Sequence, residues 1–342
     1  MPYYYPIKTI RDKEVRQRVI DRLLLLRRQM DEQIPQKTEA DTMLIATWNI
    51  KEFNNKRTLE SAYYIAEILS RFDIIAIQEV ASDLRGLQKV LSLMNSQWDY
   101  IVTDSTEGQA GGWERMAFVY DKSKISFKNV AGELVLPEKK LINMELQFAR
   151  TPFCAAFQAK WFKFKLATVH IFYGTNSSIN KRRLEEIDTV ASFLSKRSKK
   201  EDESYILLGD FNIFKTSDAT MKALEKNGFF IPDKIKEHPT DLGQTKHYDQ
   251  IAFHFKLSDK MTVFSEGKQR AGALNFTESV YTVEDFGIYR KYIPEDSIKD
   301  KTEKEILNHY LTSWRTLQMS DHLPLWAELK IDFSNEYLET LK

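Results

Sequence analysis

Polar side chains directly follow short apolar runs at four places in this sequence, and they are of types that can do chemistry. The positions are Asn49, Glu79, His170, and Asp210 with Asn212. Apolar runs of this length are typical of buried strands. Each polar residue alone has a structural explanation, such as a turn, a cap or a surface carboxylate. Their repetition at successive strand ends favours an active site held by a rigid scaffold.

The elements that would position these residues alternate between strands and helices. Strands are predicted at Met43–Trp48, Ile74–Ile77, Met116–Tyr120, Phe153–Phe157, Leu166–Phe172, Tyr205–Leu208, Gln250–Phe255 and Leu325–Leu329. Helices are predicted at Thr58–Ser70, Leu84–Asn95, Arg182–Arg197 and Ala219–Lys226. Most of the strands are continuously apolar, so both of their faces should be covered. This pattern favours a layered α/β architecture.

Four ordered motifs carry a family resemblance. They are Thr47-Trp48-Asn49-Ile50, Ile77-Gln78-Glu79-Val80, Gly209-Asp210-Phe211-Asn212 and Ser320-Asp321-His322. Over about residues 43–330 the chain resembles the endonuclease/exonuclease/phosphatase superfamily. The segments Glu114–Tyr120, Ala149–Pro152, Thr168–His170 and Tyr248–Ile251 are most similar to its DNase I branch. The resemblance implies a four-layer αββα sandwich, in which two packed mixed sheets are flanked by helices.

The resemblance also implies metal-assisted cleavage of a phosphate ester. Hydrolysis places charge on the attacking, leaving and nonbridging oxygens, and a divalent ion stabilises that charge. Hard oxygen ligands suit Mg²⁺ or Mn²⁺. By resemblance, Glu79 is the first candidate metal ligand, with Asn49 and Asp321 as helpers or ligands of a second site.

Proton transfer and phosphate binding are assigned by the same resemblance. His322 would act as general base on water, held in the useful tautomer by Asp249. His170 would pair with Glu114 and act on the leaving oxygen or bind the phosphate. Asp210 and Asn212 would orient the water and the phosphate. The candidate substrate-binding residues are Arg150, whose planar fork suits a phosphate oxygen, Asn49, Lys51 and Arg182.

The function stays open among three classes, which are two kinds of enzyme and a binding module. A DNA endonuclease is the leading hypothesis, with RNA as the alternative nucleic acid. A phosphatase or phosphodiesterase acting on lipid or small-molecule phosphates is the alternative, because such family members share the same motifs. Two positions depart from the pattern of the DNase I branch. Ala81 stands where the enzymes of that branch can use an arginine to contact DNA, and no tyrosine lies just before Glu114. A catalytically silent module should have lost several site residues, and this chain retains them.

Composition constrains the partners only weakly. The formal net charge is +1, from 50 Lys and Arg against 49 Asp and Glu. Any positive surface for a nucleic acid must therefore be local. Lys181-Arg182-Arg183, just after the His170 segment, is the better placed of two basic clusters; the second, Lys196–Lys200, favours a solvated helix end.

Cysteine usage and hydropathy favour an intracellular protein. Cys154 is the single cysteine, so no intramolecular disulfide can form, as is usual in a reducing compartment. The longest N-terminal apolar run, Leu23–Leu26, is too short for a signal peptide, and no run approaches a membrane span. We therefore predict a cytoplasmic location and no membrane contact.

The chain divides into three predicted parts. Residues 1–41 form a helical extension and linker, in which residues 8–34 have helical spacing. This helix either packs on the main domain or serves a protein partner or self-association. Residues 42–332 form the catalytic domain, with an elaboration at about 257–318 that contains a helical piece from Thr302 to Trp314. Residues 333–342 form a C-terminal tail.

Overall fold

Two β-sheets pack face to face in the computed structural model, which describes residues 2–106, 112–138, 141–142, 144–256 and 270–342. The first sheet has the strand order β10-β11-β1-β2-β4-β3 and the second has the order β5-β6-β7-β8-β9. The first contains β1 (Thr42–Phe53), β2 (Ile74–Ala81), β3 (Trp98–Val102), β4 (Glu114–Asp121), β10 (Ala271–Ala273) and β11 (Leu325–Lys330). The second contains β5 (Ile125–Glu133), β6 (Phe153–Ala159), β7 (Phe162–His170), β8 (Ser204–Asp210) and β9 (Asp249–His254).

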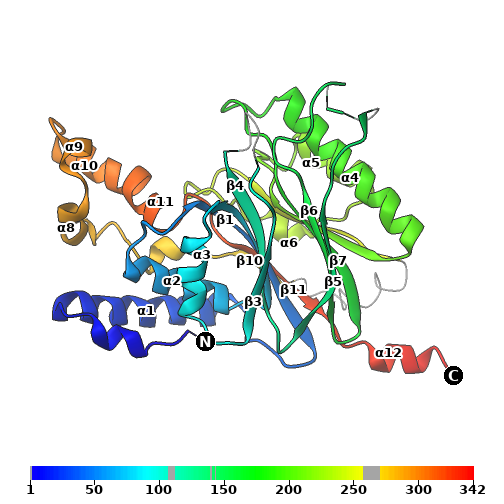
Figure 1. The fold of residues 1–342 in the computed structure, drawn as a ribbon, viewed down its shortest axis with the longest axis horizontal. Coiled ribbons are helices and arrows are strands. Elements are labelled where there is room, and N and C mark those ends of the chain that lie inside the picture. Colours follow the sequence, from blue (N-terminus) through cyan, green and yellow to red (C-terminus); the bar gives the residue numbers. More distant parts are fainter. Residues whose placement is uncertain (1, 107–111, 139–140, 143, 257–269) are drawn as a thin grey trace.

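Helices cover the outer faces of both sheets (Figure 1). The first sheet is flanked by α1 (Lys13–Gln33), α2 (Leu59–Ser70) and α3 (Arg85–Ser92). The second is flanked by α4 (Lys181–Glu201) and α5 (Ala219–Lys226). Both sheets are mixed, since β1–β2 and β7–β8 are parallel pairs and the other pairs are antiparallel. The predicted four-layer αββα sandwich is confirmed.

The alternation of side chains along β1 explains its unbroken apolar run. Met43 and Ile45 belong to the hydrophobic core between the two sheets. Leu44, Ala46 and Trp48 belong to a second core, between the first sheet and its helices. Successive residues of a strand point to opposite faces, so a strand covered on both sides is apolar throughout. All eight predicted strands are present for this reason.

Three strands were not predicted, and all lie at the edge of a sheet. These are β3, β5 and β10. Most residues of β5 beyond Ile125 are exposed, and polar residues interrupt its apolar ones. An edge strand buries little apolar surface, and the hydrophobic pattern that identifies a strand is therefore weak there.

Helix α1 packs on α2, as the first of the two predicted alternatives for residues 8–34 requires. The helical range is interrupted, because a 3₁₀ helix (η1, Tyr5–Thr9) ends before the N-cap residue Asp12. Leu23, Leu26 and Met30 are among the buried residues of α1. Two ion pairs to α2 hold the polar flanks, Arg18–Glu60 at 3.0 Å and Arg27–Glu67 at 2.8 Å.

The elaboration between β9 and β11 forms an arm beside α1 (Figure 1). Its described part, residues 270–318, contains η3 (Phe276–Glu278), α8 (Phe286–Tyr289), η4 (Arg290–Tyr292), α9 (Glu295–Ile298), α10 (Glu303–His309), η5 (Tyr310–Trp314) and α11 (Arg315–Gln318). Residues 257–269 of the predicted elaboration lie outside the described residues. Thr302 caps α10 through a capping box, which explains the start of the predicted helix. The rings of Tyr310 and Trp314, both on the π-helical turn η5, pack against the ring of Tyr289. After η5 the chain continues through α11 to Ser320-Asp321-His322.

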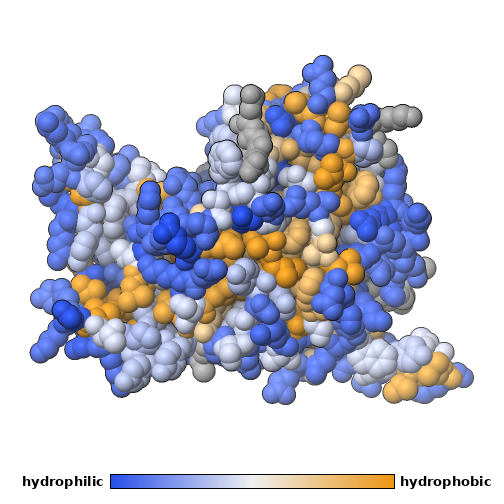
Figure 2. Space-filling model, viewed as in Figure 1, coloured by the Kyte–Doolittle hydropathy of each residue, from blue (hydrophilic) through white to orange (hydrophobic). Residues whose placement is uncertain are grey.

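Two short helices complete the described chain. The first, α6 (Asp233–Lys236), precedes β9, and the second, α12 (Ser334–Glu339), lies within the predicted C-terminal tail. Apolar side chains are visible at the end of α12 in Figure 2, where Leu338 and Leu341 are exposed. Among the helices of the described residues, none combines the length and the apolar character needed to cross a membrane.

The packing of α1 predicts a contrast between two neighbouring leucines. Leu26 is fully buried, whereas the side chain of Leu24 is 51% exposed. We expect Leu26→Ala to lower the free energy of unfolding by about 2–5 kcal/mol, because it leaves a cavity in the core between the first sheet and its helices. Leu24→Ala should change it by less than about 0.5 kcal/mol. Urea unfolding followed by circular dichroism measures both; equal effects would contradict the packing described.

Candidate active site

The ends of neighbouring strands bring the predicted site residues together. In the second sheet, His170 at the end of β7 is paired in register with Asp210 at the end of β8. Asp210 is in turn paired with Asp249 at the start of the antiparallel strand β9. In the first sheet, Asn49 of β1 is in register with Gln78 of β2, the residue before Glu79. The order of the strands therefore places these polar side chains at one end of the sandwich.

Asn49 joins the two sheets at this end. Its Nδ2 donates to Oε1 of Glu79 at 3.0 Å and to Oδ2 of Asp210 at 3.1 Å. The other oxygen of Glu79 accepts the N–H of Glu52 at 2.9 Å. Oδ1 of Asn49 is buried and has no hydrogen-bond partner among the described residues. A buried polar atom of this kind usually has a partner, so this oxygen is available to a ligand.

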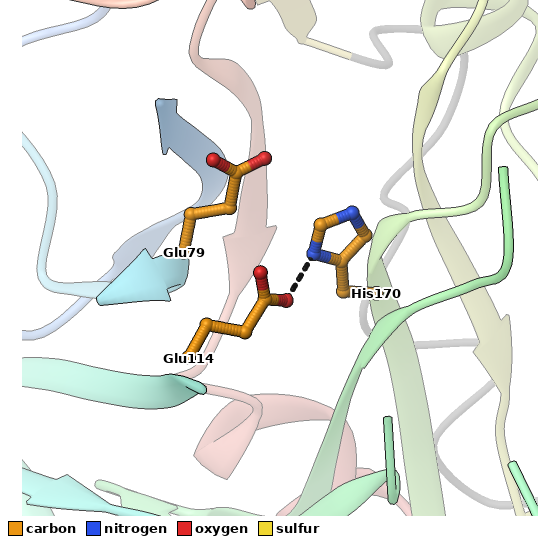
Figure 3. A group of neighbouring side chains, drawn as sticks. All are labelled: Glu79, Glu114 and His170. Atoms are coloured by element: carbon orange, nitrogen blue, oxygen red, sulfur yellow. Dashed lines mark hydrogen bonds and ion pairs between the residues drawn. The ribbon is translucent and has the colours of Figure 1, made fainter. Parts of the chain in front are cut away.

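His170 lies between two carboxylates, as Figure 3 shows in part. Its Nδ1 is 2.5 Å from Oε1 of Glu114, and its Nε2 is 3.5 Å from Oδ2 of Asp210. Nε of Arg150 is 2.6 Å from the same oxygen of Glu114. Burial lowers the pKa of His170, but Glu114 outweighs it and the pKa is raised. Burial raises the pKa of Glu114, but His170 and Arg150 outweigh it and the pKa is lowered.

His322 forms a second histidine–carboxylate pair. Its Nδ1 is 2.8 Å from Oδ2 of Asp249, and its Nε2 is 3.9 Å from Oδ2 of Asp210. The ring of Tyr248 stacks on the imidazole at 5.4 Å between centroids. Burial lowers the pKa of His322, but Asp249 and Asp210 outweigh it and hold the pKa well above its usual value. Burial raises the pKa of Asp249 itself.

Backbone contacts fix the segment that carries His322. Its carbonyl accepts the indole N–H of Trp48 at 2.8 Å. The hydroxyl of Ser320 donates to the carbonyl of Asn49 at 2.6 Å and accepts the N–H of His322 at 3.0 Å. The serine thus joins the end of β1 to the histidine and is a structural residue of the motif.

Asp210 and Asn212 stand between the two histidines. The N–H of Asn212 donates to Oδ1 of Asp210 at 2.8 Å, which leaves Oδ2 facing His170 and His322. Nδ2 of Asn212 donates to the carbonyl of Ile171 at 2.8 Å, directly after the end of β7. The turn after β8 is therefore anchored to the loop that follows His170.

Comparison with known proteins identifies the family. Residues 46–253 match the model of the Endonuclease/Exonuclease/phosphatase family. The chain belongs to this family. It is a hydrolase of the endonuclease/exonuclease/phosphatase type. The family resemblance predicted from the ordered motifs is confirmed.

Individual relatives differ in what they act on. A deoxyribonuclease from Thioalkalivibrio sp. (strain K90mix) is 29% identical over 187 residues, which are 53% of this chain and 48% of the relative. This chain thus matches about half the length of that curated relative. An endonuclease/exonuclease/phosphatase family protein from Bacteroides thetaiotaomicron is 18% identical with a TM-score of 0.56, over 86% of this chain and 96% of that one. A mannosyl-6-phosphatase from the same organism is 16% identical with a TM-score of 0.54, over 84% and 99%. The two structures show the fold.

Among the described residues of this family member, two groups of side chains could hold a metal ion. The ligand atoms of Glu79, Glu114 and His170 lie within 4.8 Å of one another, as do those of Asp210, Asp249 and His322. Figure 3 shows the first group converging from both sheets. Carboxylates and the unpartnered Oδ1 of Asn49 are hard oxygen donors, which suit Mg²⁺ or Mn²⁺. The residues therefore fit a divalent ion, with Glu79 and Asn49 as its first candidate ligands.

Three predicted residues lie in other settings. Asp321 is outside both groups, and one of its oxygens is 2.8 Å from Nζ of Lys51. Burial raises the pKa of Asp321, but His322 and Lys51 outweigh it and the pKa is lowered. Arg182 donates to the buried carboxylate of Glu186 at 3.0 Å. Metal binding by Asp321 and substrate binding by Lys51 and Arg182 stay predictions.

Two buried arginines support the site and were not predicted to do so. Arg183 was placed in a basic cluster for nucleic acid, but it is fully buried and donates to the carbonyls of Phe172, Tyr173, Thr175 and Ser177. That prediction is wrong for Arg183. Arg57 donates to the carbonyls of Lys51, Glu52 and Met319. Burial lowers its pKa to about 10. A charged residue in a polar segment gives no signal in the sequence that its partners are carbonyl groups.

The His322–Asp249 pair predicts a change in titration. Asp249→Asn removes the carboxylate that favours the imidazolium, so the pKa of His322 should fall. An NMR titration of the histidine ring protons in metal-free protein measures this directly. His309, which lies on α10 away from the site, serves as the internal reference. An unchanged or higher pKa of His322 in the variant would show that Asp249 does not control it.

The metal site predicts a loss of affinity on changing one ligand. Glu79→Gln keeps the shape of the side chain and removes its charge, so we expect Mn²⁺ binding to weaken by at least about tenfold. Isothermal titration calorimetry of the full chain measures the dissociation constant without any substrate. Glu237→Gln, at an exposed helix end, is the matched control and should bind as the wild type does. Equal loss in both variants would place the ion elsewhere.

Proposed function

We propose that the chain is a divalent-metal-dependent phosphodiesterase that cuts nucleic acid endonucleolytically, with DNA as the leading substrate and RNA as the alternative. One observation carries the proposal: Nε2 of His170 and Nε2 of His322 both face Oδ2 of Asp210. On its other side, each ring contacts a carboxylate of its own, Glu114 for His170 and Asp249 for His322. Two histidines around one point can take a proton on one side and give one on the other. The deoxyribonuclease relative supports DNA as the substrate.

His322 is assigned as the general base. A bound divalent ion would offset the charge of the carboxylates that raise the pKa of His322, which favours the neutral ring. In that ring Asp249 accepts the proton on Nδ1, which leaves Nε2 to take a proton from water. As the water oxygen forms its bond to phosphorus, that proton passes to Nε2. The ring of Tyr248 holds the imidazole plane, so the nitrogen keeps its direction.

His170 is assigned to the leaving oxygen. Its raised pKa favours the imidazolium, and Nε2 can then donate a proton as the bond from phosphorus to the leaving oxygen breaks. Arg150, beside Glu114, offers further N–H donors to a phosphate oxygen. Together, one proton leaves the water and one reaches the leaving group, so the step balances.

Five carboxylates at one end of the sandwich would repel a phosphodiester. They belong to Glu79, Glu114, Asp210, Asp249 and Asp321. A bound Mg²⁺ or Mn²⁺ would supply positive charge to the phosphate oxygens in the transition state. Asn49 and Glu79 would hold it at the side of the site that belongs to the first sheet.

A phosphatase or phosphodiesterase acting on small-molecule or lipid phosphates is the second candidate. The likeness in fold to a mannosyl-6-phosphatase favours it. Both candidates use the same histidines and differ in what surrounds the reacting phosphate.

Cleavage of supercoiled plasmid tests the proposal. With Mg²⁺ or Mn²⁺ we expect nicked DNA, none with EDTA, and a rate about 10²–10⁴ lower for His322→Ala, because the base is lost. His309→Ala is the matched control and should cut normally. If plasmid, single-stranded DNA and RNA all stay intact while a simple phosphodiester is hydrolysed, the small-molecule candidate replaces the nuclease.

A further inference from the structure

Most of the basic side chains predicted to contact substrate are neutralised within the protein. Lys51 pairs with Asp321 at 2.8 Å, Arg150 with Glu114 at 2.6 Å, and Arg182 with Glu186 at 3.0 Å. Each pair is close to electrically neutral. A polyanionic strand gains little from such pairs, so its binding requires a cation whose charge is not already balanced.

Lys246 is a cation of this kind. Its Nζ donates to the hydroxyl of Tyr248 at 2.7 Å and to Oδ1 of Asn176 at 2.9 Å, both neutral groups. It also lies over the ring of Phe214, 4.7 Å from the centroid. No ion pair found among the described residues involves Lys246. The nearby carboxylate of Asp241 instead accepts backbone N–H groups, including that of Lys246 at 2.7 Å.

The ammonium group of Lys246 lies near the general base. It is 5.1 Å from the ring centroid of Tyr248, which is itself 5.4 Å from that of His322, so it is at most about 10.5 Å from the imidazole. A nucleic-acid strand carries a phosphate about every 3.4 Å of helix axis. The ammonium group is therefore within a few nucleotides of the reacting phosphate.

The loop that holds Lys246 in place is itself rigidly held. Asn176 and Tyr173 belong to the loop between β7 and α4, whose carbonyl groups are bound by the buried guanidinium of Arg183. Gly174 in this loop has a φ of 73°, and a Cβ there would lie 2.3 Å from Nδ2 of Asn180. Tyr173 stacks on Phe214 at 6.3 Å. The ammonium group is thus presented by a preformed surface, which lowers the entropic cost of binding.

We propose that Lys246, Asn176 and the ring of Tyr173 form a subsite for the nucleotide flanking the cleaved bond, with Lys246 binding its phosphate. The subsite rests on the proposed nuclease function, and it would favour a polynucleotide over a monophosphate ester. A monophosphate ester has no second phosphate to bind Lys246 while its own phosphate reacts at His322. The half-buried ring of Tyr173 offers a surface on which a base or sugar can stack.

Binding of DNA without cleavage tests the subsite. The full chain carrying His322→Ala, with Mg²⁺ present, is titrated with a short labelled DNA, as single strand and as duplex, at several salt concentrations. Adding Lys246→Gln should raise the Kd about fivefold, as expected for loss of a solvent-accessible ion pair. It should also lower the slope of log Kd against log salt concentration by about 0.7–0.9. Lys246→Arg should keep both values closer to those of the parent.

A matched charge removal separates the subsite from a general effect. Lys122 follows β4 at the end opposite Glu114, so Lys122→Gln should leave Kd and slope unchanged. Equal slopes for the Lys246→Gln protein and its parent would overturn the subsite while the nuclease proposal stands. If the parent binds no DNA at all, the nuclease proposal itself fails. With a simple single-phosphate diester, the loss of kcat/KM in Lys246→Gln should be smaller than with DNA.

Discussion

Carboxylates gathered at one end of the sandwich have to be balanced by positive charge, and much of the surrounding structure serves that need. Asp210 and Asp249 are almost fully buried, and an unpaired buried carboxylate would be neutralised or would destabilise the fold. Nearby carboxylates raise the pKa values of His322 and His170 despite burial, so in the metal-free protein the two rings supply the nearest positive charge. A divalent ion would complete the balance on the side of Glu79 and Asn49. The same unbalanced charge makes the site repel anions until a cation enters.

Holding these groups in place requires bonds between segments that are far apart in the chain. Asn49 reaches a carboxylate from each sheet, and Trp48 and Ser320 tie β1 to the segment of His322. Arg57 joins the segment after β1 to Met319 through carbonyl groups. Arg183 does the same for the loop after β7. Buried cations that bind carbonyls fix the backbone, whereas the histidines stay available for proton transfer.

The sequence predicts the central strands and the residues at their ends because both follow from burial. Strands such as β1 are covered on two faces, so their apolar runs are unbroken. The edge strands β3 and β5 lack that signal, and they were not predicted. The site was predicted by position at strand ends and by family resemblance, which also implied the pairs His322–Asp249 and His170–Glu114, but the partners of the lysines and arginines were not predicted. Arg183 and Lys246 look alike in sequence as basic residues among polar neighbours, and both lie over the ring of Phe214. Arg183, however, is fully buried and donates to carbonyl groups, whereas Lys246 is only partly buried.

The backbone conformation of Glu79 shows why a strand pattern does not predict the direction of every site side chain. It has a φ of 60°, and the register of β2 shifts on both sides, between Asn49 and Phe53 of β1 and between Ile77 and Val80 towards β4. Bulges of this kind re-aim a side chain next to an active site. A left-handed conformation in a non-glycine residue costs free energy, and neighbouring contacts have to maintain it. The N–H of Glu52 and the amide of Asn49 hold the two oxygens of Glu79 in that orientation. The strain lies at the first candidate metal ligand, where a carboxylate has to leave its sheet to meet Glu114 of the neighbouring strand β4 and His170 of the second sheet.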